Sequence, residues 1–208
     1  MKAVLISIRP KWCEKISSGE KTIEVRKTKP KLETPFKCYV YCTAKMAGYD
    51  TLWVLDAPSR EKYSFTAVSA YLERPEGASE GNRKVIGEFT CDAITRVNLC
   101  GFWDDSGKQL DNRLKETCLT SKEFCDYLGE KVGYGWHISN LKIYDTPKDL
   151  NEFWFPPELY CEKERCGGCP FDQVPDVNGE YSFDCEWKRP LTRPPQSWCY
   201  VKEQKWND

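Results

Sequence analysis

The sequence predicts an α+β protein: a small β-barrel or curled sheet with flanking helices, followed by a short cysteine-rich C-terminal module. Three observations support this fold class. Short segments rich in strand-forming residues lie only a few residues apart, which favours antiparallel pairing. Two or three short segments with helix-capping residues separate them. Five of the 12 cysteines fall in the last quarter of the chain, so that region forms a module of its own.

Length and composition fit one domain with an extension. The chain has 208 residues, of which 40% are hydrophobic and 30% charged, and we expect a domain over residues 1–155 and an extension over 156–208. No apolar run reaches the ~18 residues that a membrane span requires. Arg9 and Pro10 interrupt the opening apolar segment before a signal-peptide core can form. We therefore expect a soluble, cytoplasmic protein with no membrane partner.

The first elements are predicted in the order strand, helix, strand, strand. Residues 3–8 form an apolar run of strand length, and the helix that follows begins near Pro10 and ends at Gly19. Residues 21–26 alternate with the period of a strand, and residues 36–43 are rich in strand formers. The next segment, 44–84, reads as an insertion with one strand, "TLWVLD", and an exposed polar loop over residues 73–84.

The remaining elements continue the mixed pattern. Residues 84–99 predict one long strand with a bulge at Gly87, and residues 136–145 predict another. A helix over 121–129 is indicated by a capping box that joins Thr120 to Glu123. A further short helix is predicted from Thr146 as its cap, with a proline at its first position. "SWCYV", in the extension, predicts a last short strand that docks on the barrel or on the cysteine-rich tail.

Charge is distributed unevenly along the chain. The net charge is -1, yet the first 45 residues hold 11 lysines and arginines against 4 glutamates. This asymmetry favours a local anion-binding face on a nearly neutral protein. The alternative is a solvated, lysine-rich surface without a ligand.

The segment "SSGEKTIEVRKTKPK", residues 17–31, places a lysine at the start of an alternating strand. If residues 21–26 form a regular strand, Lys21 shares the apolar face with Ile23 and Val25, whereas Glu24 and Arg26 form an ion pair on the other face. Lys21 then either extends along apolar surface to reach water or lies desolvated as a neutral amine that acts as base or nucleophile.

Four residues of this segment resemble a known signature. Gly19, Lys21, Glu24 and Arg26 match the G-x-K-x-x-E-x-R pattern of ASCH domains, a branch of the PUA-like superfamily. "VIGEFTCDAI" and "GYGWHISNLKIYDTPKDLNEF" are similar to the body and closing strand of that family, and the resemblance covers residues 2–155 with a longer central insertion. It implies a PUA-like β-barrel with a cleft that binds RNA or a modified nucleoside, with DNA as a further candidate.

The resemblance leaves two functions open for the cleft. In a binding module, Lys21, Arg26 and Lys27 would hold phosphate or a base edge, and Trp12 would offer a stacking surface. The second function that the resemblance implies is that of an amidohydrolase that deacylates N4-acylcytidine. Some small bacterial members of the family carry a catalytic lysine at the position of Lys21.

Those enzymes also use a threonine three residues after the lysine and a downstream glutamate. This sequence has Glu24 at the threonine position, and Glu116 or Glu88 is the candidate for the downstream carboxylate. His137, the only histidine, alternates within a strand and is expected to be structural. A third hypothesis is a protein-binding adaptor, with the acidic extension and the insertion as its contact surfaces.

The extension contains the spacing of a metal site. "CEKERCGGCP" supplies Cys161, Cys166 and Cys169, and Cys185 or Cys199 completes a tetrahedral set. Thiolate ligands favour a structural zinc ion, with iron or an iron–sulfur cluster as alternatives. Free thiols, disulfide or redox chemistry are the other interpretations, and no organic cofactor is expected. The remaining cysteines are predicted to act as small hydrophobic residues.

Overall fold

The computed structural model describes most of the chain. The described residues are 1–44, 51–70, 73–98, 101–103, 107, 109–110, 113–156 and 189–204. Their fold is α+β, as the sequence predicts, with mixed strand pairing and three α-helices in the described part. None of the described helices has both the length and the apolar character to cross a membrane.

The elements follow the chain in a mixed order. The strands are β1 (Lys2–Ile8), β2 (Ile23–Arg26), β3 (Phe36–Cys42), β4 (Thr51–Leu55), β5 (Ala67–Ala70), β6 (Ala78–Glu80), β7 (Val85–Cys91), β8 (Ile94–Asn98), β9 (Gly101–Trp103), β10 (Gln109–Leu110), β11 (Gly133–His137), β12 (Ser139–Lys148) and β13 (Trp198–Lys202). The helices are α1 (Pro10–Ser17), α2 (Ala57–Tyr63) and α3 (Ser121–Leu128), with 3₁₀ turns η1 (Leu114–Thr117) and η2 (Leu150–Glu152).

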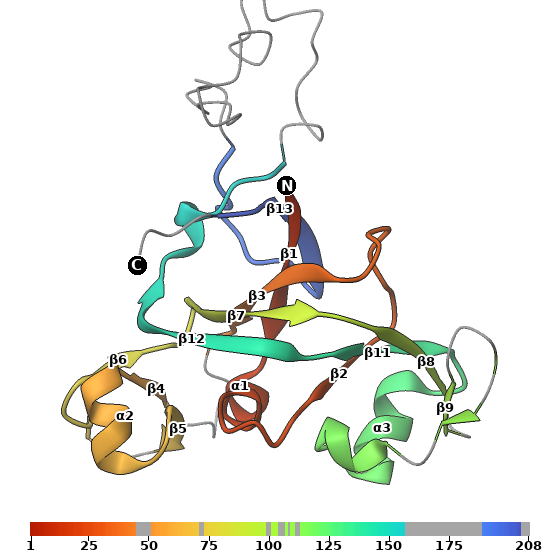
Figure 1. Cartoon of the computed structure of the whole chain (residues 1–208), viewed down its shortest axis with the longest axis horizontal. Helices are drawn as coiled ribbons and strands as arrows, with labels where there is room; N and C mark the ends of the chain where they lie inside the picture. The colour runs from red at the N-terminus through yellow and green to blue at the C-terminus, as the bar shows by residue number, and fades with distance from the viewer. Residues whose placement is uncertain are drawn as a thin grey trace, which may run out of the picture.

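These strands form three sheets (Figure 1). The first has the order β12-β7-β3-β1-β13, and the second has the order β10-β9-β8-β11-β2. The third, β5-β4-β6, lies in the insertion. Pairing is antiparallel except between β1 and β3, which are parallel because α1 and β2 lie between them in the chain. The last strand, β13, pairs with β1, so the predicted docking of the C-terminal strand on the domain is confirmed.

The two five-stranded sheets are joined where the chain passes directly from a strand of one sheet to a strand of the other. The segment predicted as a single strand over 84–99 is interrupted at Asp92 and Ala93, where β7 leaves the first sheet and β8 begins in the second. β11 and β12 are likewise separated at Ile138. In the described part, the pairing therefore gives two open sheets joined at these bends, and no pairing closes them into the predicted barrel.

The largest apolar cluster fills the space that these bends enclose. It takes residues from β1, α1, β3, β4, β7 and β11, among them the fully buried Ile6, Val40 and Trp136. Helix α1 joins the cluster through Cys13 and Ile16, which face inward because they are spaced by three residues. The bulge predicted at Gly87 is present as a shift in the β3–β7 register.

The insertion is more ordered than the sequence suggests. Residues 73–84, predicted as an exposed loop, contain β6, which pairs with β4. Helix α2 covers this small sheet (Figure 1), and Asp56 caps it by accepting a hydrogen bond from the Ser59 N–H at 3.0 Å. The expectation of a loop is wrong because three short strands supply hydrogen bonds that none of them signals alone.

Two of the three predicted helix starts are confirmed, that of α1 at Pro10 and that of α3, and the third is wrong. α3 begins after Thr120 with the predicted capping box to Glu123. The helix expected from Thr146 does not form there, because β12 continues to Lys148. The turn η2 starts instead after Asp149, whose N–H is bonded by the Glu152 carboxylate at 2.7 Å.

Candidate functional site

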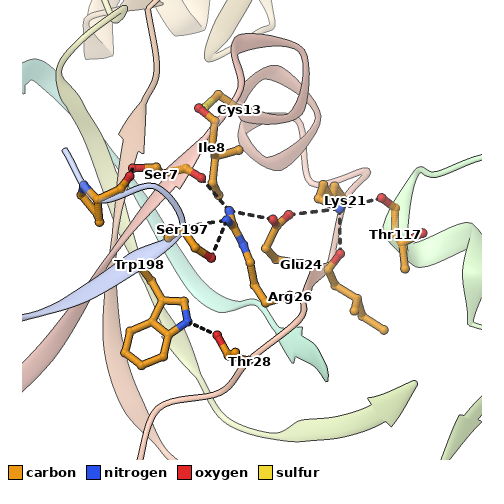
Figure 2. A network of polar contacts seen from close by, with 12 residues as sticks. Ser7, Ile8, Cys13, Lys21, Glu24, Arg26, Thr28, Thr117, Ser197 and Trp198 are labelled. Carbon is orange, nitrogen blue, oxygen red and sulfur yellow. Dashed lines mark hydrogen bonds and ion pairs between the residues drawn. The ribbon is translucent and has the colours of Figure 1, made fainter. Parts of the chain in front are cut away.

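Lys21 is buried at the base of a pocket. It follows the end of α1, where Gly19 adopts a positive φ of 76°, and its backbone N–H donates to the Lys15 carbonyl at 2.9 Å. The side chain is almost completely buried, and its Nζ donates to the carbonyls of Ile23 at 2.9 Å and Thr117 at 2.6 Å. The Glu24 carboxylate lies 3.2 Å away (Figure 2). An ammonium has three donors and these are three acceptors, so the geometry fits a protonated lysine.

Glu24 lies between two cations. One of its oxygens contacts the Lys21 amine and the other contacts Arg26 Nη2 at 2.9 Å. Arg26 Nη2 also donates to the Ser7 carbonyl at 2.6 Å, and Nη1 lies 3.3 Å from the carbonyl and hydroxyl oxygens of Ser197 (Figure 2). We call Lys21, Glu24 and Arg26 the charged triad; all three side chains are less than a tenth exposed.

The prediction that Lys21 lies on the apolar face of a strand is wrong. Strand β2 begins at Ile23, so Lys21 precedes the strand and does not follow its alternation. Its side chain is thus free to turn toward Glu24, three residues on, instead of pointing to the opposite face. The predicted Glu24–Arg26 pair does form, but it is buried, where removal of one partner is far more costly than at the surface.

A second polar cluster holds the turn that supplies the Thr117 carbonyl. Arg113 Nε and Nη2 donate to the two oxygens of the Glu116 carboxylate, at 2.8 Å and 2.6 Å, and these bonds lower the pKa of Glu116. Arg113 Nη1 also lies 3.0 Å from Nε2 of His137, and burial followed by the Arg113 charge lowers the pKa of that imidazole. The Thr22 N–H donates to the Glu116 carbonyl at 3.0 Å, which joins η1 to the start of β2.

Neither downstream glutamate from the enzyme hypothesis reaches the lysine amine. Glu116 is engaged by Arg113 and is not among the residues that line the pocket. Glu88 lies on β7, where it pairs with Lys37 at 3.0 Å and accepts the Tyr144 hydroxyl at 2.7 Å. The carboxylate that the structure places beside Lys21 is Glu24.

The pocket above the triad has a volume of about 910 Å³. Its walls come from the end of β1, from α1, from α3 and from the segment before β13. The charged side chains that line it are Arg9, Lys21, Arg26, Glu24, Glu123 and Asp126, so positive and negative groups balance. Two aromatic rings, Trp12 on α1 and Tyr127 on α3, complete the lining, and the Trp12 ring centroid lies 5.4 Å from the Lys21 amine.

One wall belongs to the C-terminal extension. Residues 194–197 line the pocket, although they are more than 160 positions from the triad in sequence. They are fixed by Ser7, whose hydroxyl donates to the Pro195 carbonyl at 2.7 Å and whose N–H donates to the Ser197 carbonyl at 2.9 Å. Neither this wall nor Tyr127 is predicted from the sequence, in which the proline pair before "SWCYV" is the local signal near the wall.

Most of the residues predicted for binding come together. Trp12, Lys21 and Arg26 line the pocket with Glu24, and Lys27 is exposed just beyond β2. The predicted metal ligands Cys161, Cys166, Cys169 and Cys185 lie outside the described residues. Cys199 is on β13, where burial raises the pKa of its thiol to about 12. Among the described residues, no three metal-ligating side chains cluster.

Comparisons with known proteins give structural neighbours only. No protein-family model and no curated protein matches the chain. Among solved structures, the chain is similar to crystal structures of ASCH from Zymomonas mobilis, at 17% identity and a TM-score of 0.44 over 72% of this chain and 75% of that one. A mutant of the same protein matches at 18% identity and a TM-score of 0.44, over 73% and 78%.

Proposed function

We propose that the protein binds RNA or a modified nucleotide, with one base in the pocket above the charged triad. The observation that carries the proposal is the composition of that pocket: the buried charged triad, with two cations and one carboxylate, lies in the same lining as the aromatic side chains of Trp12 and Tyr127. Pockets that bind small organic groups are mostly apolar, with a few polar groups placed to orient the ligand. A nucleobase has this mixed character, because it is a flat ring with hydrogen-bonding edges.

Glu24 is the group best placed to recognise a base edge. Each carboxylate oxygen can accept more than one hydrogen bond, and each is engaged by only one cation of the triad. The remaining capacity suits the amino and ring N–H donors of bases. Lys21 and Arg26 each contact one oxygen and hold the carboxylate in place, so the triad offers a preformed acceptor.

The charges at the pocket favour a neutral ring inside and phosphate outside. Glu123 and Asp126 on α3 line the same wall, where they pair with Lys11 and Lys122, so this wall offers a phosphate no unpaired cation. Arg9, which is exposed at the rim, and Lys27, just beyond the strand, are placed to meet a phosphate there. This arrangement supports a nucleotide that enters base first.

The protonated geometry of Lys21 weighs in favour of binding over amide hydrolysis. A lysine that attacks a carbonyl or activates water needs a free lone pair on nitrogen. Here the amine contacts two carbonyls and a carboxylate, which occupy the positions around the nitrogen that a substrate would need. The amidohydrolase hypothesis would require these contacts to break.

The test is a binding titration at low salt, where phosphate contacts contribute most. Short single strands of RNA and DNA and individual nucleosides would be titrated against the wild type, a Trp12→Leu variant and a matched Trp103→Leu control on β9, outside the pocket lining. We expect binding that Trp12→Leu weakens and Trp103→Leu does not. Failure of the wild type to bind any of these ligands would overturn the proposal.

A further inference from the structure

An exposed basic segment leaves the pocket directly after β2. Arg26, the last residue of the strand, points into the pocket, and the chain then runs through Lys27, Lys29 and Lys31, all of which are exposed. Lysines at every second position after a buried arginine extend the positive charge of the site outward over the surface.

Each of these lysines is next to an aromatic ring from another part of the chain. The Lys27 amine lies 5.0 Å from the centroid of the Tyr127 ring, and the Lys29 amine lies 5.6 Å from that of Tyr134. The backbone N–H of Lys31 donates to the Tyr200 hydroxyl at 2.7 Å. The cations and the rings of this segment therefore lie side by side on one part of the surface.

The segment is joined to β13 beside the pocket. The indole N–H of Trp198 donates to the Thr28 hydroxyl at 3.0 Å (Figure 2), and the Trp198 ring lies 5.4 Å from that of Tyr200. Ser197, which directly precedes this tryptophan, lines the pocket, as does Tyr127. The aromatic surface is therefore continuous with the pocket at two points.

The charges of this segment are not neutralised by carboxylates. Among the ion pairs of the described residues, none involves Lys27, Lys29 or Lys31, whereas Lys11 and Lys122 are each paired with a carboxylate on α3. Partly buried rings beside uncompensated cations are the combination that binds single-stranded nucleic acid, because rings stack on unpaired bases and cations meet phosphates.

We infer that this surface binds a single-stranded polynucleotide that continues from the base in the pocket. The surface, which we call the lysine–aromatic ridge, consists of Lys27, Lys29, Lys31, Tyr127, Tyr134 and Trp198. The inference rests on the proposed function and narrows it: the ligand is a strand, and a free nucleoside would occupy only the pocket. RNA and DNA share the phosphate and base chemistry that the ridge reads.

The experiment compares a triple variant, Lys27→Ala with Lys29→Ala and Lys31→Ala, with the wild type. The ligands are a short labelled single strand, as RNA and as DNA, the same sequence as duplex, a nucleoside monophosphate and the free nucleoside. We expect the single strand to bind wild type at least tenfold more tightly than the monophosphate. Loss of three phosphate contacts should reduce the strand affinity at least tenfold and make its dependence on salt shallower by about 2 in log–log slope.

Two controls keep the outcomes apart. The control variant combines Lys62→Ala, Lys84→Ala and Lys142→Ala. It removes three positive charges, as the ridge variant does, but from α2, from the border between the insertion and β7, and from β12 at the opposite edge of the first sheet. It should bind the single-stranded nucleic acid like wild type. The ridge variant should keep the wild-type affinity for the free nucleoside, which occupies only the pocket and has no phosphate for Lys27 to contact. Three results would contradict the proposed ridge: a single strand that binds wild type no more tightly than the monophosphate does, a single strand that binds the ridge variant as tightly as wild type, or a duplex that binds as tightly as the single strand. Absence of binding by every ligand would instead overturn the proposed function.

Discussion

Glu24 is the side chain on which the charged triad depends for stability. The change Glu24→Gln keeps the size of the side chain and removes the negative charge between Lys21 and Arg26. The two pairs are 3.2 Å and 2.9 Å long. At an effective dielectric constant of ~20, each attraction amounts to about 5 kcal/mol before the cost of desolvating the ions is subtracted.

The substitution leaves two cations buried without their counter-ion. Lys21 keeps two carbonyl partners and Arg26 keeps those of Ser7 and Ser197, so both remain hydrogen-bonded but uncompensated in charge. Breaking a buried pair in this way costs about 3 to 5 kcal/mol. That is a large part of the ~5 to 15 kcal/mol by which a typical domain is stable.

Urea denaturation followed by tryptophan fluorescence measures this loss. The matched control is Glu20→Gln, because Glu20 forms an exposed pair with Lys15 at 2.7 Å. We expect the unfolding midpoint to fall strongly for Glu24→Gln and to change little for Glu20→Gln. Equal, small effects of the two substitutions would show that water compensates the triad and would refute the argument.

Three further tests address the elements around the triad. Thr120→Ala removes the capping box of α3 and should lower the free energy of unfolding by about 0.5 to 2 kcal/mol in the same assay; an unchanged midpoint would contradict the cap. The pKa of His137 is lowered in the folded state, so the folded protein binds fewer protons than the unfolded protein below pH ~6.5. The free energy of unfolding should therefore fall as the pH drops through that range, and His137→Gln should reduce this dependence. An equal slope in the variant would exclude the histidine as its cause. Purified protein should leave N4-acetylcytidine intact, as judged by its ultraviolet absorbance; turnover that disappears in Lys21→Ala would restore the amidohydrolase hypothesis.

Local patterns in the sequence predicted the elements that depend on neighbouring residues. Thr120 and Glu123 are three positions apart, and their capping box forms as the spacing indicates. The same logic failed at Thr146, because pairing of β12 with β7 extends the strand past a residue with good capping chemistry. Strand pairing is a tertiary interaction, and it overrides a local preference.

The candidate site was predicted only as far as one segment reaches. The signature brought Lys21, Glu24 and Arg26 to attention together, but alternation placed the lysine on the wrong face because the strand begins two residues after it. The Thr117 carbonyl and Ser197 contact the triad from 96 and 171 residues away. Such contacts depend on how β13 and η1 pack, and no local pattern in the sequence encodes that packing.

The most direct test of nucleotide binding is photo-crosslinking of a short single-stranded RNA to the wild-type protein, followed by mass spectrometry of the modified peptides. If the pocket holds a base, adducts should form at Trp12 and Tyr127, the two aromatic residues that line it. Adducts confined to Tyr63 and Phe65, an aromatic pair at the end of α2 and outside the pocket, would contradict the account.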